Sequence, residues 1–368
     1  MAMDSRERLL GALRRQPVDR VPISTYELVG WDWDAWENRQ PAYRRLMEVI
    51  RAQTDCMYML GFSAPNRAAR VTVTEWDEGP SHYRREILHT PRGDLTACTR
   101  WDRDLNTAWR FERLLKTDED VARYLSQPLD PGPADLSAYA VAEERLQGGR
   151  GIPLISVADP ICIVAELFEF GEFVTRAFTQ PEQIDALLEH VAPAVYRELE
   201  YLLERGVGPL YRICGAEYVT PPYLPPSLFE RFVVRYTTPM IERIHARGAY
   251  ARLHCHGRVR RVLPMIAEMG PDAIDPVEAP PSGDVALAEV KALYGDRLCL
   301  MGNIQLRDLE TASAEEMRRI VREAVAAGKP GGGFVLMPTA APINADLSPV
   351  TERNYLILIE TALECGAA

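Results

Sequence analysis

The stretch PEQIDALLEHVAPAVYRELEYLLERGVGPLYRIC, residues 181–214, joins two elements with different apolar periodicity and sets the fold class. From Pro181 to Arg205 the apolar residues recur at helical spacing, and Gly206 ends the pattern. The run from Pro209 to Cys214 is short and apolar, as a buried strand is. A long amphipathic helix followed closely by a buried strand is typical of parallel sheets covered by helices.

The same alternation continues along the chain and predicts eight strands. They are Val21–Ser24, Cys56–Leu60, Pro153–Val157, Pro209–Cys214, Tyr250–His254, Ala273–Val277, Leu298–Met301 and Gly333–Met337. Capping signals mark three helix starts. They are Asp4 with Glu7, Ser313 with Glu316, and Ser348 before Pro349. Eight such strands alternating with helices predict an α/β fold, a single (α/β)8 TIM barrel.

One region breaks the alternation. Residues 69–111 alternate polar and apolar side chains and contain the turn sequences DEGP (77–80) and PRGD (91–94). Such a pattern is typical of antiparallel hairpins. We therefore expect a β-hairpin insertion between strands two and three of one domain that spans residues 1–368.

Composition restricts the classes of partner. The 368 residues include 42 Lys+Arg and 53 Asp+Glu, so the formal net charge is −11 and nucleic acid is excluded as a partner. Seven scattered cysteines are too irregular for a disulfide framework, which favours a reducing cytoplasm. No apolar run approaches the roughly 20 residues of a membrane span, and no signal peptide is visible. We expect a soluble cytoplasmic protein.

Polar residues follow the predicted strands, where the active site of a barrel lies. As catalytic candidates we assign Glu217, Asp159 and Tyr26. As substrate-binding candidates we assign Glu27, Asn303, Gln305, Arg258 and Thr339. Glu217 follows an apolar strand, as a general acid or metal ligand would, and a solvated loop glutamate is the alternative. Arg258 opens the basic run 258–261 at a helix start, which suits an anion site or a surface charge cluster.

The sharpest local feature is His254-Cys255-His256. Residues i and i+2 of an extended segment point the same way, so the two imidazoles are expected to converge. With Glu217 or Glu278 as a third ligand they would form an N,N,O site suited to zinc. Our assignment of metal ligands is His254, His256 and Glu278. The alternative is one structurally bonded histidine and one solvated histidine.

Six segments together carry a resemblance to a known family. They are RERLLGALRRQPVDRVPI (6–23), LLKTDEDV (114–121), YLPPSLFERFVVRYTTPMIERIHARG (223–248), LHCHGRV (253–259), PPSGDVALAEVKALYGDRLCLMGNI (280–304) and GGGFVLMPTAAP (331–342). The chain resembles the uroporphyrinogen decarboxylase superfamily, which includes zinc-dependent methyltransferases that serve corrinoid proteins and thiols. The resemblance implies an (α/β)8 barrel and a homodimer.

Departures from the family patterns indicate the branch. The RQAGRY-like motif of true uroporphyrinogen decarboxylases is absent from TYELVGWDWDAWENRQPAYRR (25–45), apart from Arg39-Gln40. The methyltransferase branch resembles H-x-C followed by a distant cysteine, all zinc ligands. Here His256 replaces the first cysteine and Ala340 stands where the second would fall. Neutral imidazoles would leave a metal more Lewis acidic than thiolates do, which favours polarising oxygen.

The leading hypothesis is a metal-dependent methyltransferase of the demethylase type. It would move a methyl group between a small methylated substrate and a thiol or a corrinoid protein, with zinc in the site and the corrinoid on a separate partner. A first alternative is a cofactor-free decarboxylase of a small acidic or tetrapyrrole-like substrate, with Asp159 or Glu217 as proton donor and Arg258–Arg261 holding carboxylates. A second alternative is a non-catalytic ligand-binding barrel.

Overall fold

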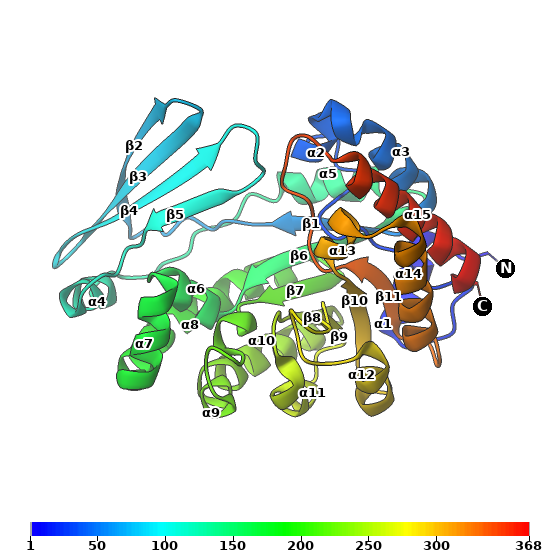
Figure 1. Ribbon diagram of the computed structural model, residues 1–368. Coiled ribbons are helices and arrows are strands. Elements are labelled where there is room, and N and C mark those ends of the chain that lie inside the picture. The colour runs from blue at the N-terminus through cyan, green and yellow to red at the C-terminus, as the bar shows by residue number, and fades with distance from the viewer. Residues whose placement is uncertain (1, 368) are drawn as a thin grey trace.

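The computed structural model describes residues 2–367, and its centre is a curled parallel sheet (Figure 1). The sheet has seven strands in the order β1-β6-β7-β8-β9-β10-β11, all paired in parallel. Their bounds are β1 (Cys56–Gly61), β6 (Gly151–Ala158), β7 (Leu210–Cys214), β8 (Tyr250–His254), β9 (Ala273–Asp275), β10 (Cys299–Ile304) and β11 (Phe334–Pro338). Each overlaps a predicted strand, and the bounds of β8 agree at both ends.

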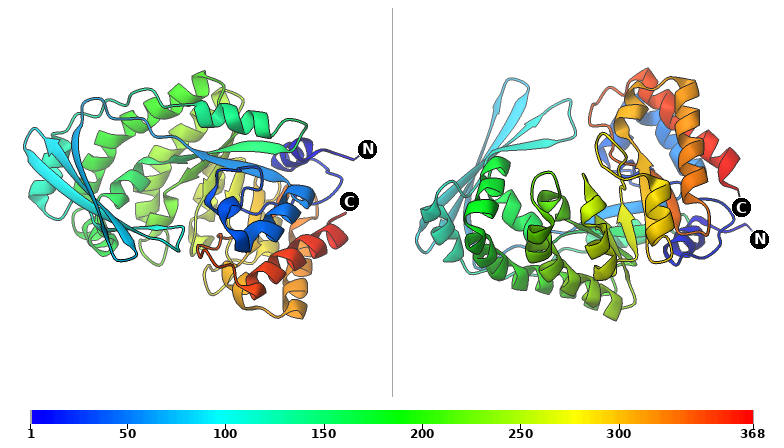
Figure 2. Two further views of the ribbon diagram at one scale, coloured as in Figure 1. Left: turned by 90° about the horizontal axis from the view of Figure 1, so that it is seen from above. Right: turned by 60° about the horizontal axis from the view of Figure 1, so that its bottom comes forward.

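Helices connect consecutive strands and lie around the outside of the curled sheet (Figures 1 and 2). The α-helices are α1 (Ser5–Leu13), α2 (Trp36–Arg39), α3 (Arg44–Gln53), α4 (Asp118–Leu125), α5 (Ser137–Arg145), α6 (Pro160–Glu166), α7 (Phe170–Thr179), α8 (Pro181–Glu204), α9 (Pro226–Phe229), α10 (Arg235–Ala246), α11 (Leu263–Met269), α12 (Leu287–Tyr294), α13 (Leu306–Thr311), α14 (Ala314–Gly328) and α15 (Pro349–Gly366). Shorter turns are η1 (Pro41–Tyr43), η2 (Ala216–Val219), η3 (Glu230–Val234, π-helical) and η4 (Val259–Arg261).

Helix α8 shows why the decisive stretch folds as it does. Proline at N1 starts the helix, and Ile184, Leu187, Leu188 and Leu199 on one face are fully or almost fully buried. Each such burial stabilises the fold by about 1.5–3 kcal/mol. The helix ends with Arg205 as C-cap, next to the predicted stop at Gly206. The alternation of helix and strand inferred from this stretch is confirmed.

Two of the three predicted caps form as expected, and the third forms in part. The Asp4 side chain accepts from the Glu7 amide and the Glu7 carboxylate accepts from the Asp4 amide, a complete capping box on α1. Ser348 caps α15 with Pro349 at N1, as predicted. Ser313 caps α14, but the predicted reciprocal bond from Glu316 is absent there because that carboxylate pairs with Arg319 instead.

The first predicted strand, Val21–Ser24, is wrong, and the sheet has seven strands instead of eight. Only a single parallel bridge joins Ile23 to Leu336 of β11. Pro22 has no amide proton to donate. The Ile23 amide donates to the side chain of Asp55 (2.9 Å), while the Ile23 carbonyl accepts from the Asp55 amide (2.7 Å). The segment therefore lies between the two edge strands and links them through isolated hydrogen bonds.

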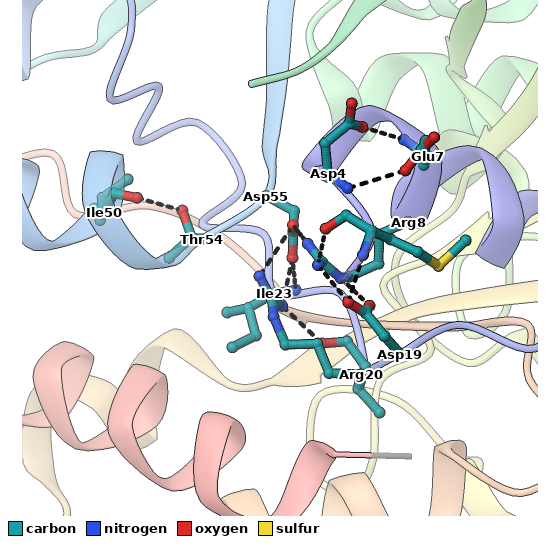
Figure 3. A network of polar contacts seen from close by, with 11 residues as sticks. Asp4, Glu7, Arg8, Asp19, Arg20, Ile23, Ile50, Thr54 and Asp55 are labelled. Atoms are coloured by element: carbon teal, nitrogen blue, oxygen red, sulfur yellow. Dashed lines mark hydrogen bonds and ion pairs between the residues drawn. The ribbon is translucent and has the colours of Figure 1, made fainter. Parts of the chain in front are cut away.

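A buried ionic cluster fixes this segment (Figure 3). Asp55, fully shielded from solvent, accepts from Arg8 of α1 (2.6 Å) and from Arg20 (2.7 Å). Arg8 also bonds Asp19 (2.7 Å), and mainly through this hydrogen bond the pKa of Asp19 falls to about 2. The cluster joins α1, the linking segment and the start of β1, and it fixes the chain just before Tyr26.

The predicted insertion between β1 and β6 is confirmed as an antiparallel sheet of four strands. They are β2 (Arg70–Glu78), β3 (Ser81–Thr90), β4 (Gly93–Asp102) and β5 (Ala108–Glu112), joined in sequence order. This sheet stands apart from the curled parallel sheet in both views of Figure 2. Leu95 and Ala97 of β4 are buried, whereas every residue of β2 is exposed.

No helix in the part of the chain that the structure describes is both long enough and apolar enough to cross a membrane.

Candidate active site

The candidate site lies after the carboxyl ends of β7, β8 and β9, beside the segment that carries Tyr26. Its centre is a buried relay of three side chains. Asp275 accepts from Nε and Nη2 of Arg252 (2.5 Å each) and bonds Nδ1 of His254 (2.7 Å). Arg252 and Asp275 are completely buried, and His254 is 3% exposed. The relay fixes the orientation of the His254 ring.

The relay also sets the protonation of both partners. Burial lowers the pKa of His254, and the attraction of Asp275 offsets this only in part. Burial opposes ionisation of Asp275, but the positive charge of Arg252 and the bonds to His254 bring its pKa well below the usual range. His254 is therefore a neutral imidazole at pH 7, with its proton on Nδ1 facing the carboxylate. Its Nε2 remains as an acceptor for a ligand.

His256 has a carboxylate partner of its own. Its Nδ1 lies 3.1 Å from Oε2 of Glu278, and the same oxygen accepts from the Gly257 amide (2.9 Å). Burial works against a charged imidazole, but the hydrogen bond and charge of Glu278 outweigh it and raise the pKa of His256. The loop after β9 turns tightly at Gly283, where a Cβ would stand 2.0 Å from the Glu278 carbonyl oxygen. His256 is thus a half-exposed imidazole that a buried carboxylate positions.

Glu217 lies in η2, directly after β7. Its Oε2 accepts from the Gly215 amide (3.0 Å). Gly215 has φ 137°, and a Cβ there would stand 1.9 Å from Oδ1 of Asp159, so only glycine fits. The hydroxyl of buried Thr220 lies within hydrogen-bond distance of the carbonyl oxygens of Glu217 (2.9 Å) and His256 (3.2 Å). Thr220 therefore ties the loop after β7 to the loop after β8.

Tyr26 and Arg212 form the inner wall. Tyr26 is buried with φ 57°, and its ring stacks on His254 at a centroid distance of 6.2 Å. Its hydroxyl accepts from Arg212 (2.9 Å), which also bonds Ser156 (3.2 Å) and Cys214 (3.3 Å). Burial raises the pKa of Tyr26 far above its ordinary value. Within residues 2–367 no carboxylate forms an ion pair with Arg212, which leaves a half-buried cation beside the site.

Asp159 and Glu27 lie next to residues of this centre, Asp159 behind Gly215 and Glu27 after Tyr26. Asp159 is completely buried as the N-cap of α6, bonded to the Cys162 amide (2.8 Å) and Thr237 (2.9 Å), and burial raises its pKa to about 7. Its bonds are those of a structural cap. Glu27 is exposed beside Tyr26.

The other four predicted substrate-binding residues lie around the strand ends. Asn303 is half-buried in β10. Gln305 occupies the N-cap position of α13 without a side-chain capping bond, and its buried side-chain nitrogen has no partner in the described chain. Thr339 is buried and accepts from the Leu306 amide (3.3 Å). Arg258 is exposed in the loop before η4.

An open cavity of about 360 Å³ adjoins the two histidine loops. It is lined by Phe170, Glu217, Tyr218, Tyr223, His256, Gly257, Glu278 and Ser282. The rings of Phe170 and Tyr223 meet edge to face with centroids 4.8 Å apart, and Tyr218 lies 6.1 Å from Phe170. The cavity thus combines three aromatic rings with two of the predicted site carboxylates.

The two histidines converge as predicted, with ring centroids 4.6 Å apart and ring planes at 86°. They do not form the predicted zinc site with Glu278, because that carboxylate is bonded to His256 and Gly257. Across residues 2–367, no group of three or more His, Cys, Asp or Glu side chains is arranged to hold a metal ion. Protein zinc sites use at least three such ligands, so the side chains present do not fit zinc.

Sequence reasoning missed Arg212, Arg252 and the three aromatic residues of the cavity. The sequence does carry a signal for the two arginines. Each stands two residues before the end of its predicted strand, at Cys214 or His254, and alternation places it on the same face as that residue. A charged residue inside an otherwise apolar strand needs a buried partner or a ligand. The aromatic residues come from separate segments, and nothing in the local pattern joins them.

Comparison with known proteins gives a consistent picture. The family described as uroporphyrinogen decarboxylase (URO-D) matches residues 109–348. A methylcobamide:CoM methyltransferase of Methanosarcina barkeri strain Fusaro is 20% identical over 307 residues, 81% of each chain. A uroporphyrinogen decarboxylase of Bordetella petrii is 26% identical over 343 residues, 88% of this chain and 86% of that protein. A methyltransferase from Methanosarcina mazei has a similar fold, with TM-score 0.61, 15% identity and coverage of 98% of this chain and 99% of that chain.

Proposed function

The chain belongs to the uroporphyrinogen decarboxylase family, and on that premise we propose that it is a methyltransferase acting on a small methylated substrate. The observation that carries the proposal is the pair of imidazoles, each held through Nδ1 by its own carboxylate, with His256 in the wall of an open cavity. A substrate in this cavity would contact side chains whose orientation is fixed by hydrogen bonds. The similarity to a methylcobamide:CoM methyltransferase supports this reaction class.

Methyl transfer requires the methyl carbon to lie in line between the leaving heteroatom and the acceptor nucleophile. The residues of this chain contribute orientation above all. Neutral His254 offers Nε2 as a hydrogen-bond acceptor, and Tyr26, fixed by Arg212, closes the inner wall. Glu217, held by the Gly215 amide, faces the substrate cavity and fixes a polar or cationic group of the donor.

The acceptor is a thiol or a corrinoid protein. A reduced corrinoid would supply a strong nucleophile for the methyl group, and it would be brought by a separate partner. We further propose a cytoplasmic homodimer, an oligomeric state that sedimentation analysis tests directly. The zinc that the family resemblance implies is not used in any of these steps, because the donor set of this chain does not fit it.

Two measurements test the proposal. The first supplies methoxy, thioether and methylammonium donors with a thiol or a reduced corrinoid as acceptor and follows methyl transfer by mass spectrometry. We expect transfer from one donor class, reduced in His254→Ala. The second is the metal content of protein purified without chelator. Near-stoichiometric zinc lost in both His254→Ala and His256→Ala would show that the histidines hold metal after all.

Decarboxylation is the second candidate, and one observation favours it. Arg212 is a half-buried cation without an ion-pair partner in the described residues, and its buried Nε has no hydrogen-bond partner. Such a group can hold a substrate carboxylate. The arginines first considered for that role do not support it, since Arg258, Arg260 and Arg261 are exposed and Arg260 pairs with Glu289. Release of CO2 from small carboxylic acids, lost in Arg212→Met, would support this reaction.

A further inference from the structure

Three aromatic rings line the cavity beside His256, and they differ in how firmly neighbouring groups hold them. Phe170 begins α7, and Tyr218 and Tyr223 follow β7. The hydroxyl of Tyr218 donates to Glu166, which is also paired with Arg113, so this ring is fixed at its polar end. The ring of Tyr223 is 48% exposed and stands edge to face with Phe170. The rings form an open aromatic wall that solvent can reach.

The charge of the lining is negative. Two carboxylates, Glu217 and Glu278, contribute to it, and none of the eight lining residues is lysine or arginine. Glu278 is paired with His256, whose Nδ1 lies 3.1 Å from its carboxylate. Within residues 2–367 Glu217 forms no ion pair, and the one hydrogen bond of its carboxylate comes from a backbone amide. The aromatic wall therefore lies in the same cavity as a carboxylate that forms no ion pair in the described residues.

Aromatic faces and a carboxylate without an ion-pair partner together suit one chemical class of ligand, an organic cation. The negative face of an aromatic ring attracts a cation, and organic ammonium ions that carry methyl groups bind in such aromatic settings. We propose that the cavity binds a methylated ammonium ion as the methyl donor, with its methyl groups against Phe170, Tyr218 and Tyr223 and its charge toward Glu217. The assignment as donor rests on the proposed methyltransferase function, while the binding itself does not.

The chemistry of this donor agrees with the side chains present. The acceptor nucleophile forms a bond to the methyl carbon while the carbon–nitrogen bond breaks, and the bonding pair stays on nitrogen. The products are the methylated acceptor and a neutral amine. Because the leaving amine is neutral, its departure needs neither a proton nor Lewis-acid assistance, unlike an alkoxide. Methyl transfer from a donor of this class therefore needs no Lewis acid. This agrees with the described residues, in which the two histidines have no third metal ligand.

Calorimetric titration of the full-length protein tests the binding. The probes are choline and its uncharged carbon analogue 3,3-dimethylbutan-1-ol. We expect choline to bind at least tenfold more tightly. Tyr223→Leu should weaken choline binding by about 2- to 30-fold, the loss of one cation–π contact. Glu217→Gln should weaken choline binding without changing that of the alcohol. Phe178→Leu, which removes an exposed ring of α7 outside the cavity, is the matched control and should bind as the wild type does.

The outcomes separate this inference from the proposed function. Equal affinity for choline and the alcohol, no binding of choline, or unchanged choline affinity in both Tyr223→Leu and Glu217→Gln would overturn the inference. Methyl transfer from a methoxy or thioether donor alone would also overturn it, while the proposed methyltransferase function would stand. Charge-selective binding without methyl transfer to any acceptor would refute the methyltransferase and leave an ammonium-binding site.

Discussion

Replacing Asp275 by asparagine perturbs the relay at its centre. The substitution keeps the shape of the side chain but removes the charge that Arg252 and His254 face at 2.5–2.7 Å. Arg252 is completely buried, and no carboxylate in the described chain other than Asp275 is within ion-pair distance of it. An unpaired buried charge of this kind costs about 3–5 kcal/mol, so we expect Asp275→Asn to lower the free energy of unfolding by that amount.

Urea denaturation followed by circular dichroism measures the change. Asp284→Asn is the matched control, because Asp284 bonds the backbone amide of exposed Arg260 and its loss should cost at most about 1 kcal/mol. Combining Asp275→Asn with Arg252→Met removes both charges, and the pair should be less destabilised than the sum of the single changes. If Asp275→Asn costs no more than Asp284→Asn, the reasoning about the buried relay is refuted.

Three further predictions follow from the same geometry. The pKa of Asp159 in the folded chain is about 7, and its ordinary value is 3.8. The stability that its protonation contributes is therefore complete at low pH and is lost as pH rises toward 7. Between pH 5 and 7 this loss lowers the free energy of unfolding of the wild type by about 2–3 kcal/mol, and urea denaturation at each pH should show that Asp159→Asn removes this decrease. Gly215→Ala adds a clash to a φ of 137° and should cost more than about 2 kcal/mol, whereas Gly206→Ala, with φ 70° and open space, should cost about 1 kcal/mol; similar losses would contradict this account. Thr220→Val should cost about 1–3 kcal/mol and weaken choline binding, and unchanged choline affinity would show that the two loops hold their positions without it.

The sequence could predict the elements whose signal is local. Helix α8 and strand β8 follow from periodicity, and the insertion follows from the alternation and turn residues of 69–111. The segment Val21–Ser24 looks like a strand because it is short and apolar. Its failure to form one depends on Asp55, 32 residues away, which takes the Ile23 amide. Such competition for a backbone donor is not visible in a local pattern.

The family could also be predicted from the sequence, because six separate motifs resemble it, and the match over residues 109–348 confirms it. The arrangement of the site residues could be predicted only in part. Spacing alone indicates that His254 and His256 converge, since the rings are two residues apart at a strand end. Whether Glu278 binds a metal or an imidazole nitrogen depends on the fold of the turn through Gly283, which spacing does not specify.

The measurement that tests the central claim most directly follows a 13C-labelled methyl group by NMR. The donor is N-methyl-labelled choline, supplied with a thiol or reduced corrinoid acceptor and with wild type, Glu217→Gln or Phe178→Leu protein. The account predicts that the label moves to the acceptor with wild type and with Phe178→Leu, and at least about tenfold more slowly with Glu217→Gln. A label that stays on nitrogen in every sample, or that moves equally fast with Glu217→Gln, would contradict it.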